Sequence, residues 1–350
     1  MSNQRIKIIF GIITAAIIAV ISITCSVNMP KIIELSFEEP FEGANANETT
    51  LHSIQKVGEF YTVNYHGDYI ERLQWLNEYH TKESARLNQT HCSLFATYTT
   101  TEEPLLGRNF DRLRETPVLA KFSAPGKYSS FAFSPASEVF LREVYGVEQP
   151  TEDQMNKFLY CLPFFATDGI NEKGLSIAIA GAPPRHVERP DTCQPMFVLL
   201  FIRHVLDNCM NVEEVARFAE TVALYDSDLG TISHHFVVVD ASGHWLVIDY
   251  PNGDLRLLLG QGESQARSNH FLDGGSAIDN TSFWRYDKLF KALNSKGPMD
   301  SEYSAMDLLK RVRHDTKWSV VYESRSGIGL IAVKENYRKL YRFKFTNADS

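Results

Sequence analysis

The stretch HCSLF at residues 91–95, followed by GRNFD at residues 107–111, decides the fold we expect for this chain. Both stretches are typical of short strands, and the turn between them folds Arg108 and Asp111 back over the thiol of Cys92. An arginine beside a cysteine favours the thiolate, which is the reactive form. If Cys92 were a chain terminus, its own α-amino group could act as a base, yet a long segment precedes it.

Length, composition and charge limit the class of protein. The 350 residues suffice for one large domain or two smaller ones, and a content of 44% hydrophobic and 12% aromatic residues can build a substantial core. The formal net charge of −8 comes without a long basic run, which argues against nucleic acid as a partner.

The five cysteines and the histidines give little support to a metal site. No CxxC or Cys/His ligand spacing occurs. The pair His234-His235 lies on an expected strand, where neighbours point to opposite faces, so we expect two satisfied histidines. We therefore expect no metal and no cofactor. Cys161, Cys193 and Cys209 are expected as buried free thiols, with disulfides among them as the alternative outside the cytosol.

Residues 1–31 are expected to be a signal anchor or a signal peptide. Arg5 and Lys7 precede an uncharged apolar stretch, residues 8–27, whose length suits one membrane span. Acidic residues follow, which places the N-terminus inside and the rest outside the cytoplasm. We expect a membrane-anchored protein facing outside; the alternatives are a secreted or periplasmic protein and, less favoured, a lipoprotein modified at Cys25.

The remaining chain divides at Cys92. Residues 32–91 are expected to form a pro-region or linker: residues 32–60 are polar and irregular, and residues 67–84 carry an apolar stripe at helical spacing. Strand patterns dominate from there on, so residues 92–350 are expected to form one catalytic domain.

Strands and helices alternate in groups within residues 92–350. Expected helices are 196–208, a second one capped by Asn211, about 281–294 and about 304–313; expected strands are 95–98, 131–133, 158–161, 175–179, 235–239, 245–249, 318–322, 328–333 and 340–345. We also expect a tight hairpin turn at Asn252-Gly253. Runs of strands broken by paired helices indicate layered sheets covered by helices, an α+β arrangement.

Several residues offer the groups that an acyl-transferring cysteine requires. Such a cysteine needs a base, an oxyanion hole and groups that orient the thiol. Arg108 and Asp111 are candidates to orient Cys92. Further along the chain, Asn269 offers a neutral donor for an oxyanion, and Arg285 offers a second positive charge.

In their order and spacing, these motifs resemble the choloylglycine hydrolase/penicillin V acylase family of linear amide C–N hydrolases, with kinship to acyl-CoA:6-aminopenicillanate acyltransferase and acid ceramidase-like enzymes. The matching stretches span roughly residues 92–346 and comprise Cys92, GRNFD at 107–111, DGINEKGL at 168–175, residues 235–249, Ser268-Asn269 and SFWR at 282–285. The resemblance implies an N-terminal nucleophile hydrolase, an αββα sandwich of two antiparallel sheets.

The resemblance also implies a nucleophile and its activation. Cys92 would attack the substrate after autoproteolysis of the His91–Cys92 bond exposes its α-amino group. With an ordinary pKa of about 7.7–8.0, such an amine is suited to act as a base near neutral pH. Asp111 would hold this amine.

The remaining roles follow from the same resemblance. Arg108 and Arg285 would flank the thiol, and the Asn269 side chain would donate to the oxyanion. The other oxyanion position, often Asn in the family, is Gly181 here, which can still offer its backbone N–H. A second departure is Arg112, where many relatives carry an aromatic residue.

We therefore expect an extracytoplasmic cysteine amidohydrolase that acts on a small-molecule acyl amide. By resemblance, the candidate substrates are conjugated bile acids, penicillin V, N-acyl homoserine lactones and N-acyl ethanolamines or sphingoid amides, which the sequence does not rank. The alternatives are an acyltransferase of the same fold and a membrane-tethered binding protein that has lost catalysis. The sequence leaves assembly into a homo-oligomer open.

Overall fold

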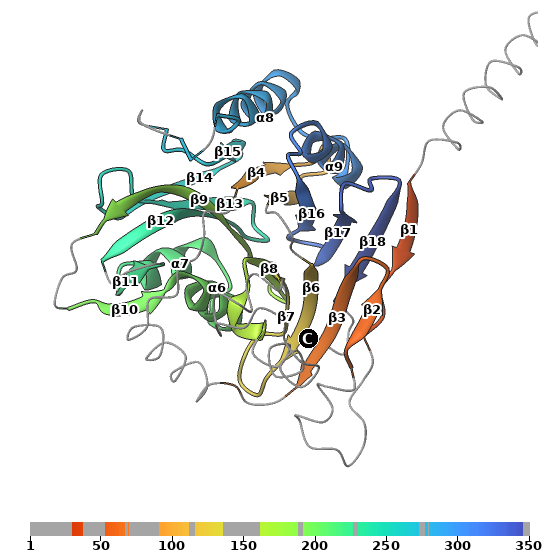
Figure 1. Cartoon of the computed structure of the whole chain (residues 1–350), viewed down its shortest axis with the longest axis horizontal. Helices are drawn as coiled ribbons and strands as arrows, with labels where there is room; N and C mark the ends of the chain where they lie inside the picture. Colours follow the sequence, from red (N-terminus) through yellow and green to blue (C-terminus); the bar gives the residue numbers. More distant parts are fainter. Residues whose placement is uncertain are drawn as a thin grey trace, which may run out of the picture.

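The computed structural model has two large β-sheets packed face to face, with helices on their outer faces (Figure 1). The structure describes residues 30–37, 53–66, 69, 91–111, 116–135, 162–187, 192–226, 230–272, 277–278 and 280–345. Within these ranges the layers follow the order helix, sheet, sheet, helix, which confirms the expected αββα arrangement.

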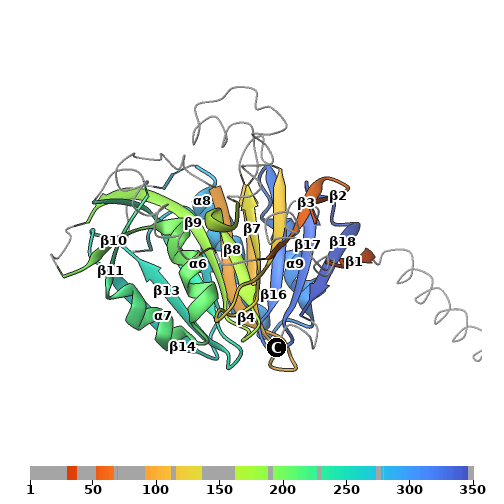
Figure 2. The ribbon, with the colours of Figure 1, turned by 90° about the horizontal axis from the view of Figure 1, so that it is seen from below.

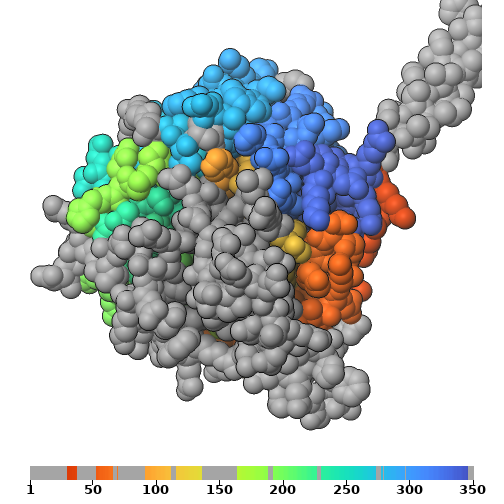
Figure 3. Space-filling view, in the orientation of Figure 1, coloured from red at the N-terminus to blue at the C-terminus, as the bar shows by residue number. Residues whose placement is uncertain are grey.

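The first sheet has seven strands in the order β1-β18-β17-β16-β5-β4-β15. They are β1 (Lys31–Glu34), β4 (His91–Tyr98), β5 (Pro104–Asp111), β15 (Gln265–Arg267), β16 (Thr316–Glu323), β17 (Ile328–Val333) and β18 (Lys339–Lys344). Its outer face is covered by α8 (Ser282–Lys296) and α9 (Glu302–Arg311), which form one surface of the molecule (Figure 3).

The second sheet has nine strands in the order β14-β13-β12-β9-β8-β7-β6-β3-β2. They are β2 (Gln55–Val57), β3 (Phe60–His66), β6 (Pro117–Ser123), β7 (Ser130–Pro135), β8 (Asp168–Asn171), β9 (Ser176–His186), β12 (Thr231–Val239), β13 (His244–Asp249) and β14 (Arg256–Gln261). Its outer face packs on α6 (Val198–Asn208) and α7 (Val212–Ala219) (Figure 2). A 3₁₀ turn, η1 (Leu162–Phe165), and a parallel pair, β10 (Gln194–Phe197) with β11 (Val222–Tyr225), lie beside α6.

Alternation of side chains along the strands separates the apolar layers. On β12, Val237 and Val239 belong to the core between the two sheets, whereas Phe236 and Val238 belong to the core under α6 and α7. Because both faces are buried, the strand reads as a continuous apolar run in the sequence.

The expectation of two antiparallel sheets is wrong, because each sheet contains one parallel pair. Strand β1 runs parallel to β18, and β3 runs parallel to β6. Strand β1 lies almost wholly in the range expected to be irregular, and most of β3 lies in residues 61–66, for which no element was expected. The reason is visible in β3, where Thr62 and Asn64 are buried polar residues between apolar ones, so the sequence lacks a clear apolar signal.

The segment before Cys92 is built into the core of the residues that follow it. Phe60 packs between the sheets, and Tyr69 is fully buried among aromatic rings near α6. The Tyr69 hydroxyl donates to Asp207 Oδ1 at 2.6 Å, and Arg203 pairs with the same oxygen at 2.6 Å. The domain boundary at residue 91 stays a prediction, but strands on both sides of it share the two sheets.

Two local expectations are confirmed and one is refined. Asn211 Oδ1 accepts a hydrogen bond from the backbone N–H of Glu214 at 2.9 Å, which caps α7. Strands β12 and β13 form the expected hairpin. The turn at 252–253 belongs to a longer connection between β13 and β14.

Some expectations fall outside the described residues. They are the apolar segment at 8–27, the helix at 67–84 apart from Tyr69, and the strand at 158–161. In the described part of the chain, no helix is long and apolar enough to cross a membrane. Cys92, Cys193 and Cys209 are free thiols.

The buried contact of Tyr69 predicts a measurable loss of stability. We expect Tyr69→Phe to lower the free energy of unfolding by about 1–3 kcal/mol, because Asp207 loses a buried donor. Tyr69→Ala should cost about 3–5 kcal/mol through lost aromatic packing. Urea unfolding of both variants, beside Tyr61→Phe on β3 as a partly buried control, measures these losses. Equal stability of Tyr69→Ala and the parent chain would contradict the assigned contact.

Candidate active site

Cys92 lies where the backbone ladder between β4 and β15 ends. The pairing stops at Arg267, two residues short of the position opposite Cys92. Side chains replace the missing ladder bonds. Asn269 Oδ1 accepts from the backbone N–H of Cys92 at 2.9 Å, and the Cys92 carbonyl accepts from Arg285 Nη1 at 2.5 Å and from Ser268 Oγ at 3.3 Å. The backbone of Cys92 is thereby fixed on both of its polar atoms.

Arg285 reaches Cys92 from α8 and joins several groups. Its Nη2 donates to Asn269 Oδ1 at 2.9 Å, and its Nη1 also donates to Ser93 Oγ at 3.1 Å. The residue is fully buried, with Nε donating to Thr281 Oγ1 at 3.1 Å. Arg285 therefore belongs to the site and not to a solvated helix face.

Arg108 lies beside the thiol on the face between the sheets. Its Nη2 is 3.5 Å from Cys92 Sγ, and its Nη1 forms a buried ion pair with Asp168 on β8 of the other sheet. Asp168 also accepts hydrogen bonds from the Trp318 indole N–H at 3.2 Å and from the Tyr322 hydroxyl. The sequence did not single out Asp168, which lies in a stretch interpreted as a turn before a core strand.

The carboxylate of Asp111 lies away from the thiol. Residues three apart on a strand point to opposite faces, so Arg108 reaches Sγ while Asp111 accepts from Thr316 Oγ1 at 2.6 Å. Asp111 Oδ2 is 3.7 Å from Arg285 Nη1. The expectation that both residues fold over the thiol is therefore wrong for Asp111. In this uncut chain Asn269 holds the backbone nitrogen of Cys92.

Burial sets the charge state of Asp111. Desolvation raises the pKa of its carboxyl from 3.8 to about 7, although Arg285 and the hydroxyl of Thr316 pull the pKa in the opposite direction. The group therefore titrates in the same range as an α-amino group.

Asn269 and Gly181, the two expected oxyanion residues, are in contact. Asn269 Nδ2 donates to the carbonyl oxygen of Gly181 at 2.8 Å, while its Oδ1 faces Cys92 and Arg285. An amide nitrogen has two hydrogens, so it can donate to two acceptors. The backbone N–H of Asn269 donates to Ser282 Oγ at 2.8 Å, which fixes the turn after β15.

His91 precedes Cys92 at the start of β4. It is the register partner of Asp111, and its ring stacks at 6.5 Å on His314. Polar backbone groups alternate in direction along a strand, so the backbone of His91 faces β5 while that of Cys92 faces Asn269.

The expectation of two satisfied histidines holds for His234 and is wrong for His235. His234 Nδ1 lies 2.7 Å from Asp226 Oδ2. The ring of His235 is fully buried, and neither of its nitrogens has a hydrogen bond within the described residues; Nδ1 is 3.8 Å from Asp249 Oδ1.

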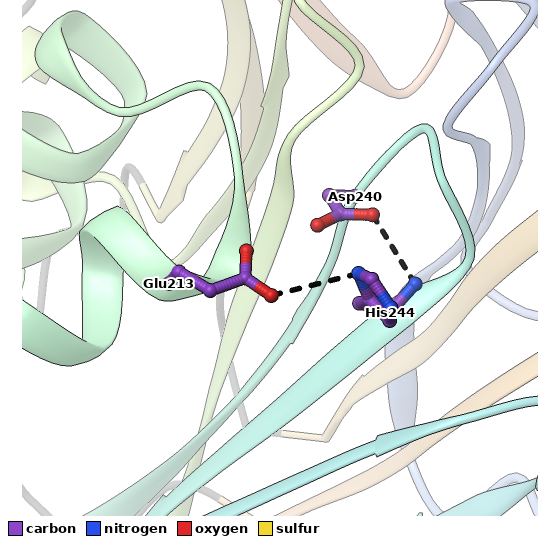
Figure 4. Close-up of side chains that lie close together, drawn as sticks. All are labelled: Glu213, Asp240 and His244. Carbon is purple, nitrogen blue, oxygen red and sulfur yellow. Dashed lines mark hydrogen bonds and ion pairs between the residues drawn. The ribbon is translucent and has the colours of Figure 1, made fainter.

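One group of possible metal ligands occurs within the described residues: Glu213, Asp240 and His244 (Figure 4). The Asp240 carboxylate accepts from the backbone N–H groups of Ser242 at 2.9 Å and Val212 at 3.2 Å. These bonds close the β12–β13 turn and hold the start of α7, so we assign the group a structural role.

The fold and part of the sequence match known proteins. Residues 162–315 match the family model of acyl-coenzyme A:6-aminopenicillanic acid acyl-transferase. The structure is similar to penicillin V acylase from Agrobacterium tumefaciens, with 15% identity, a TM-score of 0.51 and coverage of 69% of this chain and 83% of that one. It is also similar to a variant of conjugated bile acid hydrolase from Clostridium perfringens, with 16% identity, a TM-score of 0.50 and coverage of 74% and 94%. No curated protein matches the chain in sequence.

These similarities confirm the family resemblance. The chain shares the αββα fold of the penicillin V acylase and bile acid hydrolase structures, and its residues 162–315 match the acyl-transferase family model. At such low identity the solved structures establish the fold alone, so the chemistry must be argued from the residues around Cys92.

The raised pKa of Asp111 predicts a pH-dependent stability. The folded state binds this proton more tightly than the unfolded chain, so the stabilisation is complete below about pH 4 and is lost as the pH rises through about 7. We compare Asp111→Asn with its parent in a Cys92→Ala background, which keeps both chains uncut. As the pH rises from about 4 to about 7, the parent should lose up to roughly 4 kcal/mol of unfolding free energy that Asp111→Asn does not lose. Parallel pH profiles would show that Asp111 keeps an ordinary pKa.

Proposed function

We propose that this chain is a cysteine amidohydrolase that cleaves a linear amide of an acyl chain through an acyl-enzyme on Cys92. One observation carries the proposal: the side chain of Arg108 lies at the Cys92 thiol, while Asn269 and Arg285 hold the polar backbone atoms of the same residue. Any buried residue at the end of a ladder needs partners for its backbone, so the contact that sets Cys92 apart from a buried structural cysteine is the guanidinium of Arg108 at its thiol.

Activation requires cleavage of the His91–Cys92 bond. In the proposed step, Cys92 Sγ attacks the carbonyl carbon of His91, the C–N bond breaks, and the thiol proton passes to the departing nitrogen. Water then hydrolyses the thioester, which returns the thiol and leaves a carboxylate on His91. Cys92 becomes a chain terminus whose α-amino group can serve as the base.

Turnover would use the same groups in a second acyl transfer. The amine takes the thiol proton as Sγ attacks the substrate carbonyl, and the N–H of Gly181 and the Nδ2 of Asn269 donate to the developing oxyanion. The amine returns the proton to the leaving nitrogen, and water hydrolyses the thioester. The acyl chain leaves as a carboxylate.

The second candidate is an acyltransferase of the same fold. It is favoured by the family model matched over residues 162–315, which describes an acyl-transferase. The two functions differ in the acceptor of the acyl group, which is water or an amine, and product analysis with an added amine separates them. For either function we propose a site outside the cytoplasm, on the basis of the charge pattern around residues 8–27.

The proposed activation predicts a new N-terminus at Cys92. N-terminal sequencing of the purified protein should find a chain that begins at Cys92, and Cys92→Ala should abolish the cut and lower amidase activity by roughly 10⁴-fold or more. Cys209→Ala is the matched control, because Cys209 is also buried but lies after α6. A native chain that stays uncut yet hydrolyses amides would exclude this mechanism.

The fold further predicts that the severed N-terminal segment stays bound. Strand β3 is hydrogen-bonded between β2 and β6, β1 pairs with β18, and Tyr69 is buried beside Asp207. After cleavage, two polypeptides should therefore elute together in gel filtration under native conditions and separate in denaturant. Loss of the N-terminal fragment under native conditions would contradict the assigned strand pairing.

A further inference from the structure

A row of polar residues crosses the second sheet next to the candidate site. The pairing of β12 with β13 ends at Phe236 and Ile248, so His235 and Asp249 are the next residues along the two strands. The register of β13 with β14 places Asp249 opposite Arg256. On the other side, His235 pairs with Ala180, the residue before Gly181. One line of cross-strand neighbours thus runs from the oxyanion strand to β14.

This row lies on the face between the two sheets. His235 lies on the same face of β12 as Val237 and Val239, and Asp249 lies on the same face of β13 as Val247 and Trp245. These four apolar residues belong to the core between the sheets. The apolar core therefore ends at His235 and Asp249. This end of the core is near Gly181, whose carbonyl contacts Asn269. The same Asn269 side chain contacts the backbone of Cys92.

Asp249 is the negative charge of the row and lies between Arg256 and His235. Its Oδ2 accepts from Arg256 Nη2 at 3.0 Å, and its Oδ1 is 3.8 Å from His235 Nδ1. Burial alone would raise the pKa of Asp249, but His235, Arg267 and Arg256 lower it to about 2, so the carboxylate is ionised.

Positively charged side chains lie near the row. Burial lowers the pKa of His270 to about 4, and the charges of His235, Arg267 and Arg285 act in the same direction. Positive charges favour an anion nearby.

Within the described residues, His235 has the ion-pair contact with Asp249 at 3.8 Å but no hydrogen bond. The ring is fully buried, both nitrogens lack a hydrogen bond, and the nearest acidic oxygen is beyond hydrogen-bond distance. Buried polar groups are nearly always hydrogen-bonded, so an exception next to a reactive cysteine indicates a missing ligand. With Nδ1 turned toward Asp249, Nε2 lies on the other side of the ring and is available to that ligand.

We propose that His235, backed by Asp249, binds an anionic group of the substrate, with a carboxylate as the simplest example. The imidazole then lies between two anions, donating from Nε2 to the substrate and from Nδ1 toward Asp249. His235 is a specificity-determining residue in this scheme, and Asp249 is a positioning residue. The proposal rests on the proposed amide substrate, but it concerns only which amides are bound.

The carboxylate can belong to either half of the substrate, so two pairs of probes are needed. The first pair consists of ketone isosteres of an N-acylglycine and its glycinamide, in which CH₂ replaces the scissile N–H and prevents hydrolysis. The second pair carries the carboxylate, or the matching primary amide, at the far end of the acyl chain. Calorimetry measures the affinity of each probe for the full-length protein.

Three variants test the role of His235. His235→Leu removes the donor, His235→Gln keeps a neutral donor, and His244→Gln is the control, a partly exposed histidine at the opposite end of β13. The wild type should bind one carboxylate probe at least about tenfold more tightly than its amide. His235→Leu should lose this preference, His235→Gln should keep part of it, and His244→Gln should retain it.

Other outcomes overturn the proposal. Equal affinity for carboxylate and amide in both pairs would exclude an anion site, as would binding of no probe at all. A preference that persists in His235→Leu would assign the anion to another residue. Because binding needs neither cleavage nor turnover, a carboxylate preference in a protein without amidase activity would reject the proposed function and keep this site.

Discussion

The guanidinium of Arg285 is the contact on which the candidate site depends, because it closes a gap in a backbone ladder. Strand β15 leaves β4 before it reaches Cys92, and an unpaired N–H and C=O at that depth would each cost about 1–3 kcal/mol. Arg285 donates to the Cys92 carbonyl and to the same Asn269 oxygen that accepts from the Cys92 N–H. The nucleophile is held through its backbone, so its side chain remains available for chemistry.

A second buried charge pair ties the two sheets together at the thiol. Arg108 comes from β5 of one sheet and Asp168 from β8 of the other, and neither is exposed to solvent. Removing one partner of such a pair leaves an isolated buried charge and typically costs about 3–5 kcal/mol. Trp318 and Tyr322 also donate to Asp168, so three side chains from two strands, β5 and β16, fix its position. The guanidinium beside Cys92 therefore has little freedom to move.

Residues with a local signal were predictable from the sequence, and residues that act through distant pairing were not. Asn211 marks the start of a helix because its side chain caps α7. Strand β17 has the bounds that its apolar run predicted, residues 328–333. Strand β3 was missed because its stability comes from pairing with β6, more than fifty residues away. The family resemblance brought Arg108, Asn269 and Arg285 together correctly, but the partner of Arg108, Asp168, becomes visible only when the two sheets are packed.

The uncut geometry also explains why Asn269 and Asp111 need not compete for the nitrogen of Cys92. A peptide nitrogen has one hydrogen, and Asn269 Oδ1 takes it. In the proposed activation this nitrogen becomes an amine with additional hydrogens and the capacity for positive charge. Asp111, which the β4–β5 register places beside His91, has a pKa of about 7 while it is buried without that charge. An ammonium group nearby would favour the carboxylate, so cleavage and ionisation of Asp111 would support each other.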